Sequence, residues 1–544
     1  MTGMSKPTRR EFIKETAAAA VASNVPLLSL AKVASGYSLD EYEADVRKNG
    51  LQITWQKICD RVIADGEDSE GILQVPKFGE LYEIGLAQVD KNAKKESGQY
   101  YTPPDVSRVM AEWFDRCKGS VICDVGCGVG NLILAYFEYI GRERTLEILR
   151  QGRLHLYDLD PVALFICVKS IAIRYGADIE RFIHVHQGDF IDANVRLPED
   201  CKVITNPPYG SIDEVPDCWP ATDVINDSKE LYSSFMEKIL EQSVASVIIT
   251  PYSFIGGKKF YSLRRKMNSH NGFVVSFDNV PGAIFCGRKH GIFNTNTSNS
   301  VRATITVVEN DGLGNGFRFS PLIRFKAVER TRLLKCDVLE SFVGAIRQTV
   351  DRGHPMFAKC DRRLDNIFDA WNRAGEHTPL ALYLSDIGAY EMFIPNSCRY
   401  FTSASVKSLS RKGQINLRFA DADVFNYIFC LVNSSFSYWH WRLYDGGITY
   451  PKGLLLGMPV FYERLSSDDK EFFKTVATEM IRDADSFIVT KNNIGIQENI
   501  KYPRRYRDEI NERLLKILNI GMDAKIFDIV HSNMALEVNV GNHS

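Results

Sequence analysis

The chain contains a short apolar strand that runs directly into a glycine-rich turn and then into a helix. Residues 121–125 read Val-Ile-Cys-Asp-Val and residues 126–130 read Gly-Cys-Gly-Val-Gly, after which residues 132–139 show helical apolar spacing. In α/β folds such a turn lies at the carboxyl edge of a parallel sheet, where glycine lets the backbone approach a nucleoside. A glycine turn alone is a weak signal, so its context decides its meaning.

Residues 98–308 alternate short β-rich runs with helical patterns. Strands are expected at 121–125, 154–157, 182–185, 202–205, 244–250, 273–277 and 301–308. This alternation is typical of an α/β domain with a mostly parallel sheet, here of seven strands. The fold class predicted from the pattern is therefore α/β.

Acidic residues stand at the ends of the next two expected strands. Asp158 ends one, and Asp189 follows the other with Phe190 directly after it. A carboxylate at such a position can accept hydrogen bonds from both ribose hydroxyls, and an acid beside an aromatic ring suits adenine. Each acid alone would most often be a solvated loop residue. Together with the glycine turn, they predict a nucleoside pocket.

A second motif, Asn206-Pro207-Pro208-Tyr209, follows the strand expected at 202–205. Its two prolines have no N–H donor, so the segment presents mainly acceptors. An exocyclic aromatic amine fits, because the Asn206 side-chain oxygen and the Pro207 carbonyl can accept its two N–H bonds. Tyr209 offers a face for stacking the base, worth about 1–3 kcal/mol, which would offset part of the cost of flipping it out of a duplex.

The order of these motifs resembles that of a known enzyme family. Asp124–Asn131 followed by Asn206–Tyr209 is similar to the S-adenosylmethionine-dependent amino-methyltransferases. Residues 98–103, Gly-Gln-Tyr-Tyr-Thr-Pro, resemble the additional cofactor motif of the gamma group of N6-adenine DNA methyltransferases, the TaqI-like enzymes of bacterial restriction–modification systems. The resemblance covers about residues 96–310 and implies a Rossmann-like class I methyltransferase core.

The resemblance implies a role for each matching residue around the cofactor. Tyr101 and Thr102 would hold the methionine end of S-adenosylmethionine, and Asp124, Gly126 and Gly128 would line the cofactor.

The remaining roles concern the nucleoside and the target base. Asp158 would bind the cofactor's ribose, and Asp189 with Phe190 its adenine, while Asn206–Tyr209 matches the catalytic loop. The family also has an aromatic residue on the far side of the flipped base, for which Phe285 is the candidate.

The implied activity is site-specific methyl transfer to the N6 amine of a flipped adenine in duplex DNA. S-adenosylmethionine is the expected cofactor, double-stranded DNA the expected partner and a cognate restriction endonuclease a candidate further partner. No metal is expected, and the scattered cysteines show no zinc or redox spacing. Two alternatives stay open: a protein-glutamine or RNA-adenine methyltransferase, and a non-catalytic DNA-binding relative.

Two departures from the family pattern affect these assignments. Asp158 follows Asp124 by 34 residues, against roughly 20 in the dinucleotide-binding pattern, and segment 141–152 accounts for the difference as an insertion. A nuclease-like pattern, Pro216-Asp217 with Asp227-Ser228-Lys229, follows the catalytic loop. It falls inside the methyltransferase core, so we expect no cleavage activity.

The C-terminal half carries candidate DNA contacts. Between residues 396 and 418 the chain has five cations and no acid, namely Arg399, Lys407, Arg411, Lys412 and Arg418. Such a segment suits phosphate contacts, although a solvated loop is equally expected. A second basic cluster comprises Lys501, Arg504, Arg505 and Arg507. With 66 basic and 68 acidic residues overall, a polyanion-binding surface must arise from charge placement.

Aromatic residues lie between these two clusters. Residues 431–436 with Tyr438, Trp439 and Trp441 resemble a segment of the family's target-recognition domains. These aromatics are expected in the core more often than on bases. The sequence does not identify the residues that read the target.

The domain organisation follows from these segments. We expect an N-terminal segment at 1–40, a helical lead-in at 41–95, the catalytic domain at 96–310 and a mixed α+β target-recognition domain at 311–544. Residues 8–14, Thr-Arg-Arg-Glu-Phe-Ile-Lys, resemble a twin-arginine export signal, but an alanine-rich helix is the favoured interpretation. No apolar run reaches the length of a membrane span. Because the implied substrate is duplex DNA, the expected location is cytoplasmic and nucleoid-associated.

Overall fold

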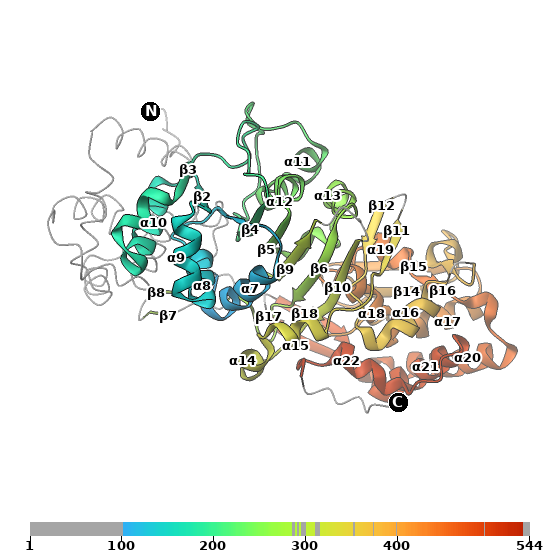
Figure 1. The fold of residues 1–544 in the computed structure, drawn as a ribbon. Coiled ribbons are helices and arrows are strands. Elements are labelled where there is room, and N and C mark those ends of the chain that lie inside the picture. Colours follow the sequence, from blue (N-terminus) through green and yellow to red (C-terminus); the bar gives the residue numbers. More distant parts are fainter. Residues whose placement is uncertain are drawn as a thin grey trace. The chain divides into compact units, whose positions relative to one another are not determined.

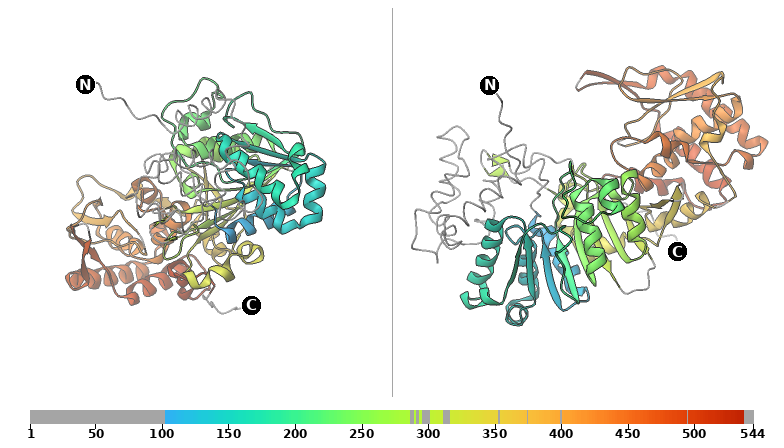
Figure 2. Two further views of the ribbon diagram at one scale, coloured as in Figure 1. Left: turned by 90° about the vertical axis from the view of Figure 1, so that its left-hand side faces the viewer. Right: turned by 90° about the horizontal axis from the view of Figure 1, so that it is seen from above.

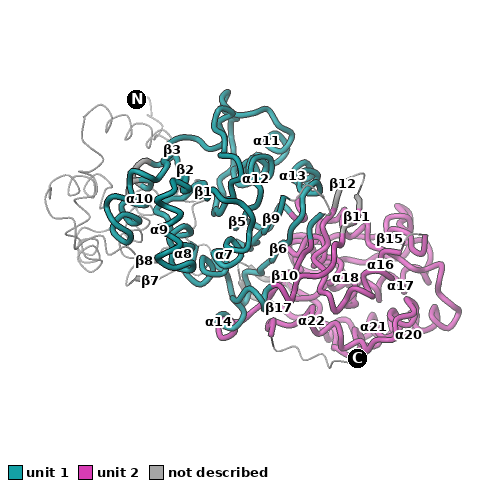
Figure 3. The backbone as a smooth tube through the Cα atoms, viewed as in Figure 1, with its two compact units in different colours: residues 1–254, 258–317, 330–339 teal, residues 255–257, 318–329, 340–544 magenta. Residues whose placement is uncertain are grey.

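The computed structural model describes residues 102–285, 289–290, 293–294, 301–310, 316–351, 354–373, 375–398, 400–493 and 495–536. The expectations for 1–40 and 41–95, including the twin-arginine-like segment, lie outside these ranges. The chain divides into two compact units (Figure 3). The first unit comprises residues 1–254, 258–317 and 330–339, and the second comprises residues 255–257, 318–329 and 340–544. Within the described residues, no helix is both long and apolar enough to cross a membrane.

The first unit is built on a mostly parallel sheet (Figure 1). The strands of this sheet are β1 (Val121–Val125), β2 (Leu154–Asp158), β3 (His184–Gln187), β4 (Cys201–Thr205), β5 (Ala245–Pro251), β6 (Asn271–Phe277), β9 (Ala303–Glu309) and β10 (Gly316–Ile323), and residues 318–323 of β10 are counted with the second unit. The strand order is β10-β6-β9-β5-β4-β1-β2-β3. Strands β3, β2, β1, β4 and β5 are parallel, and β9 is antiparallel to both β5 and β6. The predicted α/β class is confirmed.

Helices lie on both faces of this sheet (Figure 2). The helices in this part of the chain are α7 (Pro104–Arg116), α8 (Asn131–Ile140), α9 (Arg142–Arg150), α10 (Pro161–Tyr175), α11 (Asp223–Ser228), α12 (Leu231–Gln242), α13 (Tyr261–Met267), α14 (Arg330–Leu333) and α15 (Cys336–Ser341). A further short pairing joins β7 (Lys289–His290) to β8 (Phe293–Asn294). Buried Lys202 of β4 ties the sheet to α7, because its Nζ donates to the Phe114 carbonyl at 2.9 Å.

Three details correct the strand prediction. The sheet has eight strands instead of seven, because β10 begins at Gly316, beyond the predicted end of the catalytic domain at residue 310. The strand expected at 182–185 begins two residues later, since Ala177–Phe182 forms a 3₁₀ helix. The insertion at 141–152 forms α9. None of these changes the carboxyl edge of β1, β2 and β4.

The second unit packs helices around a large apolar core. Its longer helices are α16 (Asp365–Trp371), α17 (Ala422–Val432), α18 (Ser435–Tyr444), α20 (Ser467–Arg482) and α21 (Arg504–Ile517), with the short α19 (Lys452–Leu456) and α22 (Asp528–His531). Its strand pairs are β11 (Gln348–Asp351) with β12 (His354–Phe357), β13 (Thr378–Pro379) with β16 (Pro459–Val460), β14 (Tyr390–Pro395) with β15 (Gln414–Phe419), and β17 (Ile488–Asn493) with β18 (Gly495–Ile500). Tyr438, Trp439 and Trp441 of α18 are almost fully buried in this core, which confirms the expectation that they are core residues.

Candidate functional site

The glycine turn connects β1 to α8 through three residues with positive φ. Gly126, Gly128 and Gly130 have φ values of 69°, 52° and 89°, a region that side-chain-bearing residues rarely adopt. A Cβ at Gly130 would lie 2.5 Å from Sγ of Cys167 in α10, so this glycine allows close packing. A Cβ at Gly128 would meet no described atom within 4 Å. The turn therefore leaves open space beside Gly128.

Asp124 is a buried carboxylate at the base of this turn. Its side chain is 1% exposed, and neither oxygen has a hydrogen-bond partner of normal geometry in the described ranges. Burial, followed by the charge of Asp158, raises the pKa of Asp124 well above its ordinary value, and the backbone N–H of Ile133 opposes this only in part. A buried carboxylate without a partner is costly, so this position suits a cationic or hydrogen-bond-donating ligand.

Asp158 lies at the carboxyl end of β2 and contacts the turn directly. Its Oδ2 accepts from the backbone N–H of Gly128 at 2.7 Å, and its Oδ1 accepts from the N–H of Asp160 at 2.9 Å. The predicted proximity of this carboxylate to the glycine turn is confirmed, and the inserted α9 does not displace it. Its contact with a ribose stays a prediction.

Asp189 and Phe190 follow β3 and are held by neighbouring side chains. Asp189 Oδ2 accepts from Trp219 Nε1 at 2.8 Å, and the buried Phe190 ring packs on Phe235 with 5.0 Å between centroids. Lys238 Nζ donates to the Phe190 carbonyl at 2.6 Å, and burial lowers the pKa of Lys238 to about 8. This segment is thus rigidly placed, and its contact with adenine stays a prediction.

The Asn206–Tyr209 loop lies beside the glycine turn. Asn206 Nδ2 donates to Thr102 Oγ1 at 2.9 Å, which fixes the orientation of the Asn206 amide. Tyr209 Oη donates to the Ile249 carbonyl at 3.2 Å. A Cβ at Gly126 would lie 3.9 Å from Cδ of Pro208, so the structure brings the two predicted sites together.

Thr102 has a contact that the sequence pattern does not predict. Its hydroxyl accepts from the Asn206 amide, with 3% of the residue exposed, and its contact with the cofactor stays a prediction. Nothing in the local pattern around residue 102 marks this contact. Tyr101, its expected neighbour in cofactor binding, lies outside the described residues.

Phe285 lies against the candidate catalytic loop. Its ring centroid is 6.1 Å from that of Tyr209, with 67° between the ring planes, and it is 1% exposed. Tyr232 of α12 contacts Tyr209 from a second direction, at 6.3 Å and 80°. The structure thus places Phe285 at the loop, and its role on the far side of a flipped base stays a prediction.

The nuclease-like pattern forms ordinary parts of the first unit. Asp217 lies exposed in a loop, whereas Asp227 and Ser228 end α11. Ser228 is buried and its Oγ donates to the Val224 carbonyl at 2.7 Å. In the part of the chain that the structure describes, no group of three or more His, Cys, Asp or Glu residues could hold a metal ion.

The basic segment of the second unit has acidic partners that come from elsewhere in the chain. Lys407 pairs with Asp485 at 2.6 Å and Arg418 with Glu391 at 3.0 Å. Arg411 donates to the Asn499 side chain. Lys412 is exposed, and Arg399 lies outside the described residues. Exposed pairs of this kind contribute about 0–1 kcal/mol, so these cations can exchange partners for phosphates at little cost.

The second basic cluster is similarly paired. Arg504 contacts Asp528 at 2.7 Å and Asp508 at 3.0 Å. Arg505 donates to the Tyr506 hydroxyl at 3.0 Å. The positive charge expected from the sequence is therefore partly neutralised in both clusters.

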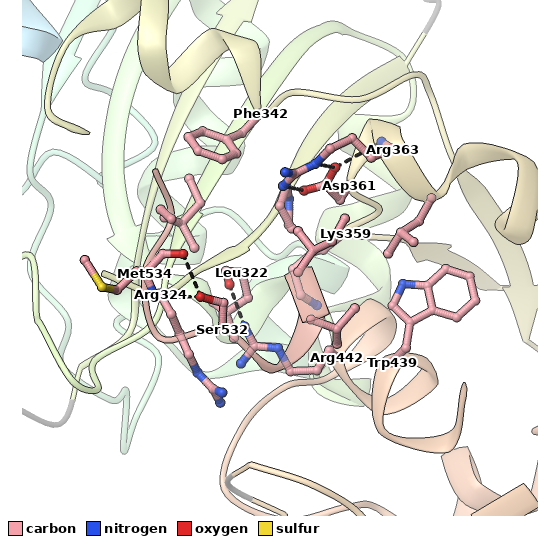
Figure 4. A pocket seen from close by; sticks show the side chains of 16 residues that line it. Leu322, Arg324, Phe342, Lys359, Asp361, Arg363, Trp439, Arg442, Ser532 and Met534 are labelled. Carbon is pink, nitrogen blue, oxygen red and sulfur yellow. Dashed lines mark hydrogen bonds and ion pairs between the residues drawn. The ribbon is translucent and has the colours of Figure 1, made fainter. Parts of the chain in front are cut away.

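A cavity of about 60 Å³ lies within the second unit (Figure 4). Arg363 and Asp361 form a bidentate pair at its wall, at 2.8 and 2.7 Å, and Arg442 Nη2 donates to the Leu322 carbonyl at 2.5 Å. Trp439 also lines it. These charged side chains bind other groups of the second unit, so their contacts stabilise the fold of that unit and do not point to a ligand site.

Comparisons with known proteins agree with the motifs. Residues 74–272 match the family model of the N-6 DNA methylases, a range that contains both the glycine turn and the Asn206–Tyr209 loop. The match confirms the predicted resemblance.

Two curated relatives have related descriptions. The EcoEI methylase subunit of a type I restriction enzyme from Escherichia coli is 22% identical over 215 residues, which cover 38% of this chain and 43% of the relative. The MjaIX methylase subunit from Methanocaldococcus jannaschii is 28% identical over 158 residues, which cover 28% of this chain and 25% of the relative. The chain thus spans less than half the length of these relatives.

Solved structures give weaker likenesses. A nuclease-deletion mutant of the type ISP restriction–modification enzyme LlaGI, in complex with a DNA substrate mimic, aligns with a TM-score of 0.46 and 12% identity. The alignment covers 96% of this chain and 74% of that one. At this score the likeness adds nothing to the fold assignment, which rests on the strand order.

Proposed function

We propose that this chain transfers a methyl group from S-adenosylmethionine to the N6 amine of an adenine flipped out of duplex DNA. The observation that carries the proposal is the placement of the oriented Asn206 amide and Tyr209 beside the glycine turn. The match to the N-6 DNA methylase model over the same residues supports it. By analogy with the relatives, we further propose that the chain acts within a restriction–modification system.

The residues at the turn fit this cofactor. The buried carboxylate of Asp124 suits the cofactor's ammonium group, and the open space at Gly128 suits a ligand that approaches the backbone. Asp158 would bind the ribose hydroxyls. When bound, S-adenosylmethionine supplies a methyl group made electrophilic by the positively charged sulfur.

The catalytic loop would act on the adenine amine. Asn206 Oδ1 and the Pro207 carbonyl would accept its two N–H bonds, since Asn206 Nδ2 already donates to Thr102. Two acceptors outside the ring plane draw the nitrogen from planar towards tetrahedral, which makes its lone pair available. Tyr209 would hold the base by stacking. The methylated nitrogen sheds its extra proton readily, so orientation matters more than a strong base.

The proposed substrates indicate where in the cell the chain acts. Duplex DNA and S-adenosylmethionine meet in the bacterial cytoplasm, so we propose that the chain acts there.

A methyl-transfer assay tests the proposed function. The purified chain would be incubated with methyl-labelled S-adenosylmethionine and, separately, with mixed-sequence duplex DNA, RNA and a glutamine-containing protein substrate. We expect label in DNA, recovered as N6-methyladenine after digestion to nucleosides. Label found only in RNA or protein, or DNA label on cytosine, would overturn the proposal.

A further inference from the structure

Arg330 of α14 joins two segments that flank the candidate catalytic loop. Its Nε donates to Asp105 Oδ2 at 2.6 Å and its Nη2 donates to Asp105 Oδ1 at 2.9 Å. Asp105 lies in the first turn of α7, three residues after Thr102. The guanidinium thereby holds the first turn of α7. Thr102, whose hydroxyl orients Asn206, lies just before this turn in the sequence.

The same guanidinium also holds the segment that leads to Phe285. Nη1 donates to the Ala283 carbonyl at 2.7 Å, and Nη2 donates to the Ile284 carbonyl at 3.0 Å. The next residue, Phe285, packs its ring on Tyr209. The Arg330 side chain thus connects the Asp105 carboxylate to two neighbouring carbonyls that lie 178 or more positions further along the sequence.

These contacts form a closed path around the Asn206–Tyr209 loop. The path runs through Asn206, Thr102, Asp105, Arg330, Ile284, Phe285 and Tyr209. At one end it orients the amide proposed to grip the amine, and at the other it supports the ring proposed to stack the base. Arg330 hydrogen-bonds to both segments, to Asp105 in one and to Ala283 and Ile284 in the other.

Arginine suits this position for a specific chemical reason. Its planar fork presents five N–H donors in fixed directions, so it can bind a carboxylate bidentately and still reach backbone carbonyls. Lysine carries the same charge as a compact point and cannot reproduce that geometry. The side chains of Arg330 and Asp105 are 15% and 35% exposed, so solvent only partly screens the pair.

We propose that Arg330 is a positioning residue for the proposed methyl transfer, setting the spacing between the Thr102 and Phe285 segments. It acts through Asp105, Ala283 and Ile284. This inference rests on the proposed function, because it assigns Arg330 a part in the same reaction. A displacement of about 1 Å in a reacting geometry can cost about 100-fold in rate, which sets the scale of the effect.

The test compares Arg330→Lys with a matched control in the same helix. Arg332→Ala removes an exposed arginine two residues away. Single-turnover methyl transfer to duplex DNA at saturating cofactor, cofactor affinity and the thermal unfolding midpoint would be measured for each. We expect Arg330→Lys to transfer methyl about 10- to 100-fold more slowly, with cofactor affinity and midpoint close to the wild-type values. Arg332→Ala should match the wild type in all three.

A double-mutant cycle with Asp105→Asn tests the path itself. Because both changes break the same link, the double variant should lose less activity than the product of the single losses. Wild-type transfer rates in Arg330→Lys, or losses that only follow the fraction of unfolded protein, would overturn the positioning role. An inactive wild type would instead overturn the proposed function, so the two failures are distinguishable.

Discussion

Asn206 Nδ2 donates a hydrogen bond to Thr102 Oγ1 at 2.9 Å, across 104 positions of sequence. The contact joins the residue at the start of α7 to the loop after β4. It commits the amide's donor end to the protein, so the amide's Oδ1 is the end presented to an incoming N–H. The relationship explains why a threonine next to a helix start matters to a loop that lies far away in the chain.

Removal of the Thr102 hydroxyl should slow methyl transfer. Thr102→Val keeps the shape of the side chain but deletes the acceptor for Asn206, at a cost of about 1 kcal/mol. We expect the single-turnover rate at saturating cofactor to fall about fivefold to tenfold. Thr102→Ser keeps the hydroxyl and should retain most of the rate. Equal rates for the valine and serine variants would contradict the orienting role.

Tyr209 should act through its ring face more than through its hydroxyl. Tyr209→Phe loses the bond to the Ile249 carbonyl but keeps the face, so only a small effect is expected. Tyr209→Ala loses stacking worth about 1–3 kcal/mol and should weaken retention of the flipped base about 5- to 150-fold. Fluorescence of 2-aminopurine placed at the methylated position reports this directly. A phenylalanine variant as defective as the alanine variant would point to the hydroxyl instead.

Asp124 should lower the stability of the cofactor-free protein and strengthen cofactor binding. Its raised pKa means that the folded chain holds this proton where the unfolded chain has lost it. Its contribution to stability is therefore present at low pH and is lost as the pH rises through the folded-state pKa. Asp124→Asn should raise the thermal midpoint of the cofactor-free protein at neutral pH.

The same variant should bind S-adenosylmethionine more weakly. Loss of a charged hydrogen-bonding partner costs about 1.5–3 kcal/mol, which corresponds to about 10- to 150-fold in affinity. Wild-type affinity should also fall as the pH decreases, because protonation removes the charge. Calorimetric titration at several pH values measures both effects. Unchanged affinity in Asp124→Asn would exclude this carboxylate from the cofactor site.

Replacement by alanine should lower mainly the thermal midpoint at Gly130 and mainly the cofactor affinity at Gly128. Gly130→Ala combines a positive φ with a Cβ at 2.5 Å from Cys167 Sγ, a cost of about 2 kcal/mol. It should lower the midpoint by about 4–8 °C. Gly128→Ala meets open space, so its midpoint should change less while its cofactor affinity falls. Differential scanning calorimetry with cofactor titration separates the two, and identical profiles would contradict this division.

The part of the fold set by local pattern could be predicted. Val121–Val125 has the predicted bounds because the apolar run ends at Gly126, whose positive φ ends the extended backbone. The glycine turn, Asp158 and the Asn206–Tyr209 loop meet as expected, because parallel strands bring their carboxyl ends to one edge. The spacing between Asp124 and Asp158 predicts an insertion at 141–152 but does not predict that it forms the helix α9.

The contacts that could not be predicted from the sequence are mostly those between side chains far apart along the chain. The segment 396–418 contains no acid, yet Lys407 and Arg418 find Asp485 and Glu391 in the folded chain. Arg330 lies beyond the predicted end of the catalytic domain but belongs to the first unit. The partners of Arg330 are one distant carboxylate and two backbone carbonyls. Because every residue has a carbonyl, the sequence does not show which ones accept from a given side chain.

The most direct test of the account is the adenine content of cellular DNA. DNA from cells that express the wild-type chain or Asn206→Ala would be sequenced with detection of modified adenines, and cofactor binding by both purified proteins would be measured in parallel. We predict N6-methyladenine at a defined sequence with the wild type and none with Asn206→Ala, although both bind S-adenosylmethionine. Equal methylation by the two proteins, or no modified adenine with a cofactor-binding wild type, would contradict the central claim.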